Sequence, residues 1–165
     1  MSEFEFGDRT LVGHPLCVAR FEVDGILDLG ASPWTTRRIG YITGGRFEGP
    51  RLRGEILPGG GNWSTTGAGQ DGAATGTFDA RCIWKTDDGA LIYVTYTGRT
   101  WIPPEVAQAF RDPAQPQVDP SRYRLRIAPV FETSDRRYDW LNAMLAVGVG
   151  ERLANGVRHH IYEIP

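Results

Sequence analysis

The sequence has few of the residues that mark several common functional classes. Its 165 residues contain two cysteines, Cys17 and Cys82, and no Cys-x-x-Cys spacing, which predicts buried free thiols rather than a zinc site. No apolar run approaches the length of a membrane span, and the acidic N-terminus lacks the pattern of a signal peptide. A net charge of -2 gives no electrostatic reason to expect DNA or RNA. We therefore expect a soluble, cytoplasmic protein with neither a nucleic-acid nor a membrane partner.

The chain also lacks the motifs of common cofactor and nucleophile sites. It has no Gly-x-Ser-x-Gly elbow, no Walker loop and no dinucleotide fingerprint. Its three histidines are His14, His159 and His160, and the last two point to opposite faces of a predicted strand. They cannot both line one cavity, so we expect no metal site and no cofactor. One of this pair facing the interior would be a titrating group.

Lysine is almost absent, and arginine supplies nearly all of the positive charge. Lys85 is the only lysine in the chain. Arginine suits fixed, bidentate recognition of carboxylate or phosphate groups. A GC-rich genome produces the same bias, so the arginine content by itself identifies no ligand.

Charged residues occupy every second position in several strand-like segments, namely residues 51–57, 78–84 and 122–127. Successive side chains of a strand point to opposite faces, so each segment has one apolar face and one charged face. In a sandwich the charged face lies in water, whereas in a small barrel with a ligand cavity it can line a binding site.

The rest of the sequence predicts a single all-β domain over residues 1–165. Hydrophobic residues make up 41% and charged residues 23%, and 21 glycines and 11 prolines supply many turns. About nine strands follow at roughly ten-residue spacing, which favours an antiparallel sandwich or a closed barrel. Closure would also remove exposed strand edges. We predict a strand at 15–23 that continues at 26–30 after a turn, further strands at 36–43, 51–57, 62–66, 73–85, 90–98, 122–131, 144–150 and 157–164, and one short helix at 103–110.

Three ordered motifs resemble those of a known family. They are GGRFEGPRLRGEILPGGGNW, TDDGALIYVTYTGR and RIAPVFETSDRRYDWLNAMLAVGVG. Together they resemble the DUF3237 family, also called UPF0311, over nearly the whole chain. The resemblance implies a closed antiparallel β-barrel of calycin or allene-oxide-cyclase shape, and it implies a fold more than an activity.

The resemblance also singles out individual positions and two departures. Asn62 stands where the family pattern usually has Asp, and Arg124 replaces an aromatic residue. An amide does not titrate, so Asn62 cannot act as an acid or base. The positions that match the family motifs are Arg51, Trp63, Asp79, Arg81, Arg126, Glu132, Trp140 and Asn142.

Asp79 and Glu132 are the predicted catalytic groups. Asp79 and Arg81 lie on one face of one strand, where they would form a carboxylate base beside a cationic anchor. A solvated surface ion pair is the alternative. Arg51 and Arg126 are predicted to hold a ligand anion, because arginines inside a barrel need anionic partners.

Aromatic side chains complete the predicted site. Trp63, Tyr93 and Trp140 are candidate walls of a pocket, although core packing alone explains many tryptophans. Asn142 is a candidate donor to a ligand oxygen, and its alternative role is to bond local backbone in a turn.

These residues lead to two main functional hypotheses. The first is a cofactor-independent isomerase, cyclase or lyase that acts on a small, partly apolar carbonyl or carboxylate compound bound in the barrel. The second is a lipocalin-like carrier of a small hydrophobic ligand. A structural module with a filled barrel is a third alternative. The apolar stretch 144–149 is either core or the interface of a homo-oligomer.

Overall fold

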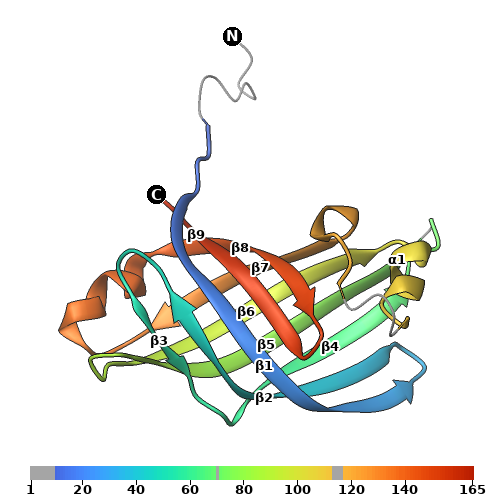
Figure 1. The fold of residues 1–165 in the computed structure, drawn as a ribbon, viewed down its shortest axis with the longest axis horizontal. Coiled ribbons are helices and arrows are strands. Elements are labelled where there is room, and N and C mark those ends of the chain that lie inside the picture. The colour runs from blue at the N-terminus through green and yellow to red at the C-terminus, as the bar shows by residue number, and fades with distance from the viewer. Residues whose placement is uncertain (1–9, 70, 113–116) are drawn as a thin grey trace.

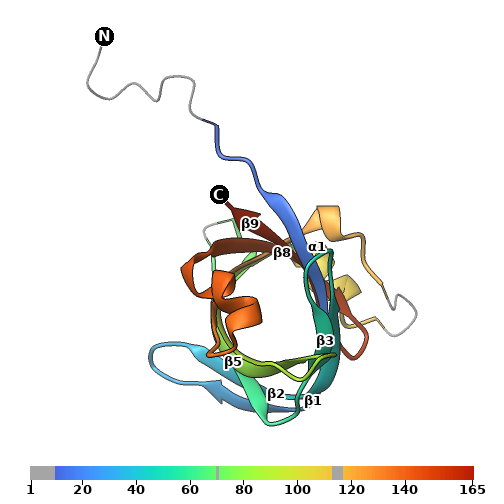
Figure 2. The ribbon, with the colours of Figure 1, turned by 90° about the vertical axis from the view of Figure 1, so that its left-hand side faces the viewer.

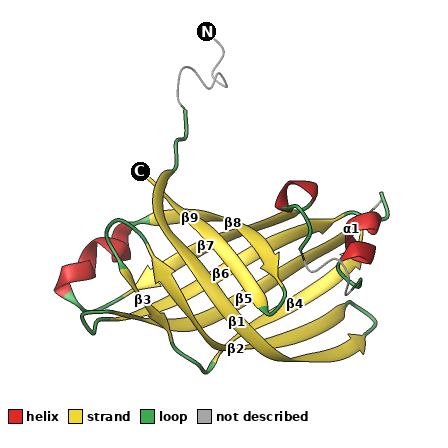
Figure 3. Cartoon of the chain, viewed as in Figure 1, coloured by secondary structure: helices red, strands yellow, loops and turns green. Residues whose placement is uncertain are grey.

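The computed structural model of the protein describes residues 10–69, 71–112 and 117–165. Strands dominate these residues, and the helical elements lie at the two ends of the sheet (Figures 1 and 3). The strands are β1 (His14–Ala31), β2 (Thr36–Glu48), β3 (Arg53–Ile56), β4 (Gly60–Ala68), β5 (Ala74–Thr86), β6 (Leu91–Ile102), β7 (Arg124–Glu132), β8 (Leu145–Leu153) and β9 (Gly156–Ile164). The helical elements are α1 (Pro104–Ala109) and the 3-10 helices η1 (Pro120–Arg122) and η2 (Arg136–Ala143).

The strands close into an antiparallel barrel. The order β1-β9-β8-β7-β6-β5 continues through β3 and β4 to β2, and β2 pairs with β1 to complete the ring. β3 and β4 both pair with β2 and β5, so they share one position, and the barrel has 8 strand positions. Figure 2 looks along the barrel from the end that carries η2. The predicted closed antiparallel barrel is confirmed.

The barrel is filled by the apolar face of each strand. On β5, the residues Phe78, Ala80, Cys82 and Trp84 are buried, and the residues between them are exposed. The same alternation on the other strands supplies a core rich in aromatic rings, as the period of two requires. Trp84 stacks on Phe47 with ring centroids 4.4 Å apart. Burial raises the pKa of the Cys82 thiol to about 12, so it is a packed, uncharged thiol, as predicted.

The two ends of the barrel differ in how they are covered. At the α1 end, Val106 and Ala109 pack with Val118 and Tyr123 in a second apolar cluster, so the short helix covers core surface. At the η2 end, Leu141 is fully buried in the main core. Among the residues described, no helix is long and apolar enough to cross a membrane.

The apolar stretch 144–149 contributes to both faces of the wall. Met144 and Ala146 are buried in the core, whereas Leu145, Val147 and Val149 are exposed on the outside. The stretch is therefore core at every second position, as its place in β8 requires.

Candidate functional site

β5 carries two of the predicted site residues on the outer wall of the barrel. The side chains of Asp79 and Arg81 are 52% and 60% exposed, and their charged groups lie 3.7 Å apart. An exposed pair of this kind contributes little to stability. The expectation that they line the interior is wrong, because the apolar residues of the same strand take the inner face. Their roles as base and anchor stay predictions.

Three further predicted residues lie at the η2 end. Arg51 forms an ion pair with Glu163, and its guanidinium lies 4.0 Å from the centre of the Trp140 ring. The Asn142 side chain accepts a hydrogen bond from the Thr133 N–H and donates one to the Thr133 carbonyl. The structure thus brings Arg51 and Trp140 together on the exposed surface, and Asn142 bonds local backbone.

The remaining predicted residues also belong to the outer wall. Arg126 and Glu132 are exposed on β7, and Tyr93 lies opposite Glu132 on β6 with 38% of its surface exposed. Trp63 is half-buried and its indole lies against Gly61, outside the wall. The expected placement of these residues inside the barrel is wrong for the same reason as on β5.

His159 is a buried polar group inside the barrel. It is 1% exposed, and its ring lies 5.6 Å from Phe21 and 5.7 Å from Tyr96, measured between ring centroids. Burial, with a smaller effect of His160, lowers the pKa of His159 to about 4, so the imidazole is neutral at pH 7. Within the described structure, its Nδ1 has no hydrogen-bond partner. A buried polar atom without a partner is costly, and a ligand atom would relieve that cost.

Asn62 supplies a second such atom, because its buried Oδ1 has no partner among the described residues. In the strand register, Asn62 on β4 lies opposite Ala80, and Ala80 lies opposite Tyr96 on β6, so the three share the inner face. With neighbouring strands about 4.8 Å apart, Asn62 and Tyr96 are about 10 Å apart along the wall. Burial raises the pKa of Tyr96, which keeps its hydroxyl protonated.

Trp84 Nε1 is also buried without a partner, but it lies in the closed half of the barrel. Its indole is packed between Phe47 and Phe131 and lies near Cys82. We therefore assign it to the core.

The inward-facing residues are less completely buried toward the α1 end than in the rest of the barrel. Trp84 and Ile92, near the η2 end, are completely buried. Toward α1, the inward-facing Ser64, Thr100 and Val157 are only half-buried. We call this part of the inner wall the mouth. His159, Tyr96 and Asn62 lie between the mouth and the closed half of the barrel.

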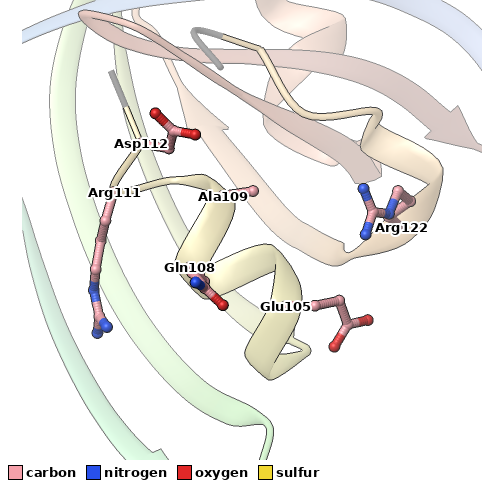
Figure 4. A pocket seen from close by; sticks show the side chains of 6 residues that line it. All are labelled: Glu105, Gln108, Ala109, Arg111, Asp112 and Arg122. Carbon is pink, nitrogen blue, oxygen red and sulfur yellow. The ribbon is translucent and has the colours of Figure 1, made fainter. Parts of the chain in front are cut away.

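Two surface hollows lie elsewhere. One, of about 570 Å³, is beside α1, where Figure 4 shows Glu105 and Arg111 projecting to different sides of the helix. The other, of about 500 Å³, lies beside Arg53 and Asp87 at the η2 end. Both are lined by charges of both signs, and neither includes the unpartnered interior atoms. No group of three potential metal ligands occurs in the described ranges.

The sequence predicted the alternation of charged and apolar residues. It also led us to expect the charged face inside the barrel, whereas that face lies on the outside. His159 was considered only as one of a pair, and Tyr96 was not singled out. The alternation along β9 could have identified His159. Every second residue of this strand points inward, and His159 is one of these buried residues, whereas His160 is half-buried against Glu151. A histidine in phase with the buried residues of its strand predicts an interior polar group.

The comparison with family models decides the family. Residues 14–164 match the family described as "Protein of unknown function (DUF3237)". The chain belongs to the DUF3237 family. The UPF0311 protein RPA1785 of Rhodopseudomonas palustris is similar to this DUF3237 chain, at 31% identity over 128 residues, covering 78% of this chain and 80% of the relative.

Solved structures of similar proteins share the fold. The β-barrel-like protein of Acinetobacter baumannii is 33% identical with a TM-score of 0.77, and the match covers 98% of this DUF3237 chain and all of that chain. The protein from Rhodopseudomonas palustris matches at 28% identity and a TM-score of 0.84, over 95% of this chain and 99% of the other. A structure described as an enzyme from Penicillium herquei has 23% identity and a TM-score of 0.64, over 97% of this chain and 100% of that one. At that identity the likeness establishes the fold alone.

Proposed function

We propose that the protein binds a small, partly apolar carbonyl compound inside the barrel and catalyses proton transfer on it without a cofactor. The observation that carries this proposal is a pair of buried polar atoms without partners, His159 Nδ1 and Asn62 Oδ1, in an otherwise apolar interior. Ligand sites commonly combine apolar walls with a few polar groups of this kind. Isomerases, cyclases and lyases of this chemistry need positioning and electrostatic stabilisation rather than a cofactor.

His159 is the proposed general base. A pKa of about 4 makes the free imidazole a weak base at neutral pH. A ligand that becomes an enolate beside it would favour the imidazolium, because opposite charges raise the pKa of a histidine. The base would therefore gain strength as the negative charge develops. It would take a proton from the carbon next to the carbonyl and return it to the ligand at the end of the step.

Tyr96 and Asn62 are the proposed partners of the ligand oxygens. The raised pKa of Tyr96 keeps a proton on its hydroxyl, which can donate a hydrogen bond to an oxyanion. The buried amide oxygen of Asn62 can accept from a ligand hydroxyl. Asn62 does not titrate, so the proton transfer rests on His159.

The test needs no knowledge of the natural substrate. The ketone 2-indanone has acidic protons next to its carbonyl, and their exchange with D2O is followed by proton NMR. We expect the protein to accelerate this exchange, and His159→Gln to reduce the acceleration by about 100-fold or more, the usual contribution of a general base. Tyr96→Phe, which removes one oxygen atom and keeps the packing, is expected to cost about 100-fold.

His160→Gln is the matched control, since it changes the neighbouring histidine, which faces the other side of β9. Far-UV circular dichroism confirms that each variant is folded. Asp79→Asn tests the catalytic group predicted from the sequence. Exchange that survives in His159→Gln but disappears in Asp79→Asn contradicts the proposal and favours the outer-wall residue.

The carrier hypothesis also has a specific observation in its favour. The interior is mostly apolar and His159 is a weak base in the free protein, as binding without chemistry would require. Binding of 2-indanone that depends on His159 and Asn62, with no acceleration of exchange, would support the carrier.

A further inference from the structure

Arg152 extends the inner wall of β8 at the mouth. Gly148 and Gly150 are buried, inward-facing positions of this strand, and Arg152 follows in the same phase, opposite Val157 on β9. Its guanidinium lies 4.7 Å from the centre of the Phe110 ring, just after α1. Arg152 is therefore an arginine at the mouth whose guanidinium contacts an aromatic ring.

Arg152 differs from the nearby Arg38 in its partners. In the part of the chain that the structure describes, no carboxylate forms an ion pair with it, whereas Arg38 is paired with Asp28 at 2.9 Å. Partial burial, together with the positive charge of Arg38, lowers the pKa of Arg152 from its ordinary value. An arginine without a carboxylate partner among the described residues is a group that an anion would stabilise.

The geometry relates Arg152 to the unpartnered imidazole. His159 lies opposite Gly150, so Arg152 and His159 are diagonal neighbours on adjacent strands, about 7–8 Å apart at their Cα atoms. Gly150 has no side chain, and a Cβ placed there would be 2.7 Å from His159 Nδ1. The same Cβ would be 2.1 Å from Leu125 Cδ2, so the unpartnered nitrogen lies beside Gly150 and the Leu125 side chain, on the strand that continues to Arg152.

We infer that the ligand of this barrel carries a carboxylate, which Arg152 binds at the mouth while the apolar body of the ligand lies beside His159. The inference rests on the proposed interior site and adds the chemical class of its ligand. Arginine binds a carboxylate through two parallel hydrogen bonds, and the contact with the Phe110 ring holds the guanidinium at the mouth. Arg152 would select acids over uncharged analogues.

The test compares two probes that differ only in charge. Binding of 2-naphthoate and of its uncharged isostere 2-naphthamide is measured by calorimetry at low and at physiological salt. We expect the full chain to prefer the acid, and Arg152→Met to weaken acid binding about 10–100-fold, as loss of a charge-assisted pair predicts. Amide binding should change less than threefold.

Arg124→Met is the matched control. Arg124 is also an exposed arginine stacked on an aromatic ring, with its guanidinium 5.3 Å from the centre of the Trp101 ring, but it belongs to the outer wall. We expect this variant to bind both probes as the parent protein does.

The outcomes separate the two proposals. If Arg152→Met prefers the acid as strongly as the parent protein does, the carboxylate inference is overturned. If His159→Gln loses amide binding in the same experiment, the interior site is still supported. Equal loss of acid binding in Arg124→Met would also overturn it, because the effect would be one of general surface charge. Binding of neither probe would overturn both proposals.

Discussion

The buried state of His159 predicts a pH dependence of folding stability that one substitution removes. In the unfolded chain this imidazole binds a proton near its ordinary pKa of 6.5, whereas in the folded protein its pKa is about 4. As the pH falls below 6.5, the unfolded state gains a proton that the folded state does not, so the free energy of unfolding decreases. Below pH 4 both states are protonated and the loss levels off.

The magnitude follows from the two pKa values. The gap between 6.5 and about 4 corresponds to about 3 kcal/mol in total, at about 1.4 kcal/mol per pKa unit. Most of the effect, about 2 kcal/mol, accumulates between pH 7.5 and pH 5. Titration of the carboxylates changes the free energy of unfolding little between pH 7.5 and pH 5. The pKa of Asp135, lowered to about 2 by hydrogen bonds from Arg137, changes stability only as the pH approaches the unfolded value of 3.8.

The assay is urea unfolding at pH 7.5 and pH 5, followed by near-UV circular dichroism. The parent protein should lose about 2 kcal/mol of unfolding free energy between the two values, and His159→Gln should lose less than about 0.5 kcal/mol. His160→Gln should retain the pH dependence of the parent. The reasoning is refuted if His159→Gln keeps the full dependence, because the imidazole would then be solvated in the folded state.

Two further predictions concern the packing of the wall. Gly98→Ala places a Cβ 2.0 Å from the Phe78 ring and should cost about 1–3 kcal/mol of unfolding free energy, whereas Gly67→Ala, with no atom within 4 Å, is the control and should cost little. Equal midpoints of urea unfolding for the two variants would contradict the assigned packing. Burial raises the pKa of Cys17 and Cys82 to about 12, so iodoacetamide should leave both thiols unmodified at pH 8 and modify both in urea, as mass spectrometry would show. Rapid labelling of the native protein would place a thiol at the surface.

The barrel could be predicted because its signals are local. Residues 73–85 alternate strictly, and the structure contains the corresponding strand β5 from Ala74 to Thr86. The short helix was indicated by its prolines, and α1 begins at Pro104. The sequence pattern did not predict that β3 and β4 share one position in the barrel, because this arrangement depends on both strands pairing with β2 and β5.

The candidate site was harder to predict, because alternation identifies two faces without saying which one surrounds the ligand. The charged face of β5, with Asp79 and Arg81, matched the family motifs but lies outside. The inner face carries Asn62, Tyr96 and His159 on three strands that are far apart in the chain, and only the register brings them together. Likewise, the missing partner of His159 Nδ1 is a property of the packed barrel that no strand shows by itself.

A crystal structure of the protein grown with 2-naphthoate would locate the ligand itself. We expect the aromatic rings of the probe within contact distance of Tyr96 and Phe21, an atom of the probe or a bridging water hydrogen-bonded to His159 Nδ1, and the carboxylate on Arg152. A fully occupied probe on the outer wall beside Asp79 and Arg81, with the interior packed as it is in the free protein, would contradict the interior site.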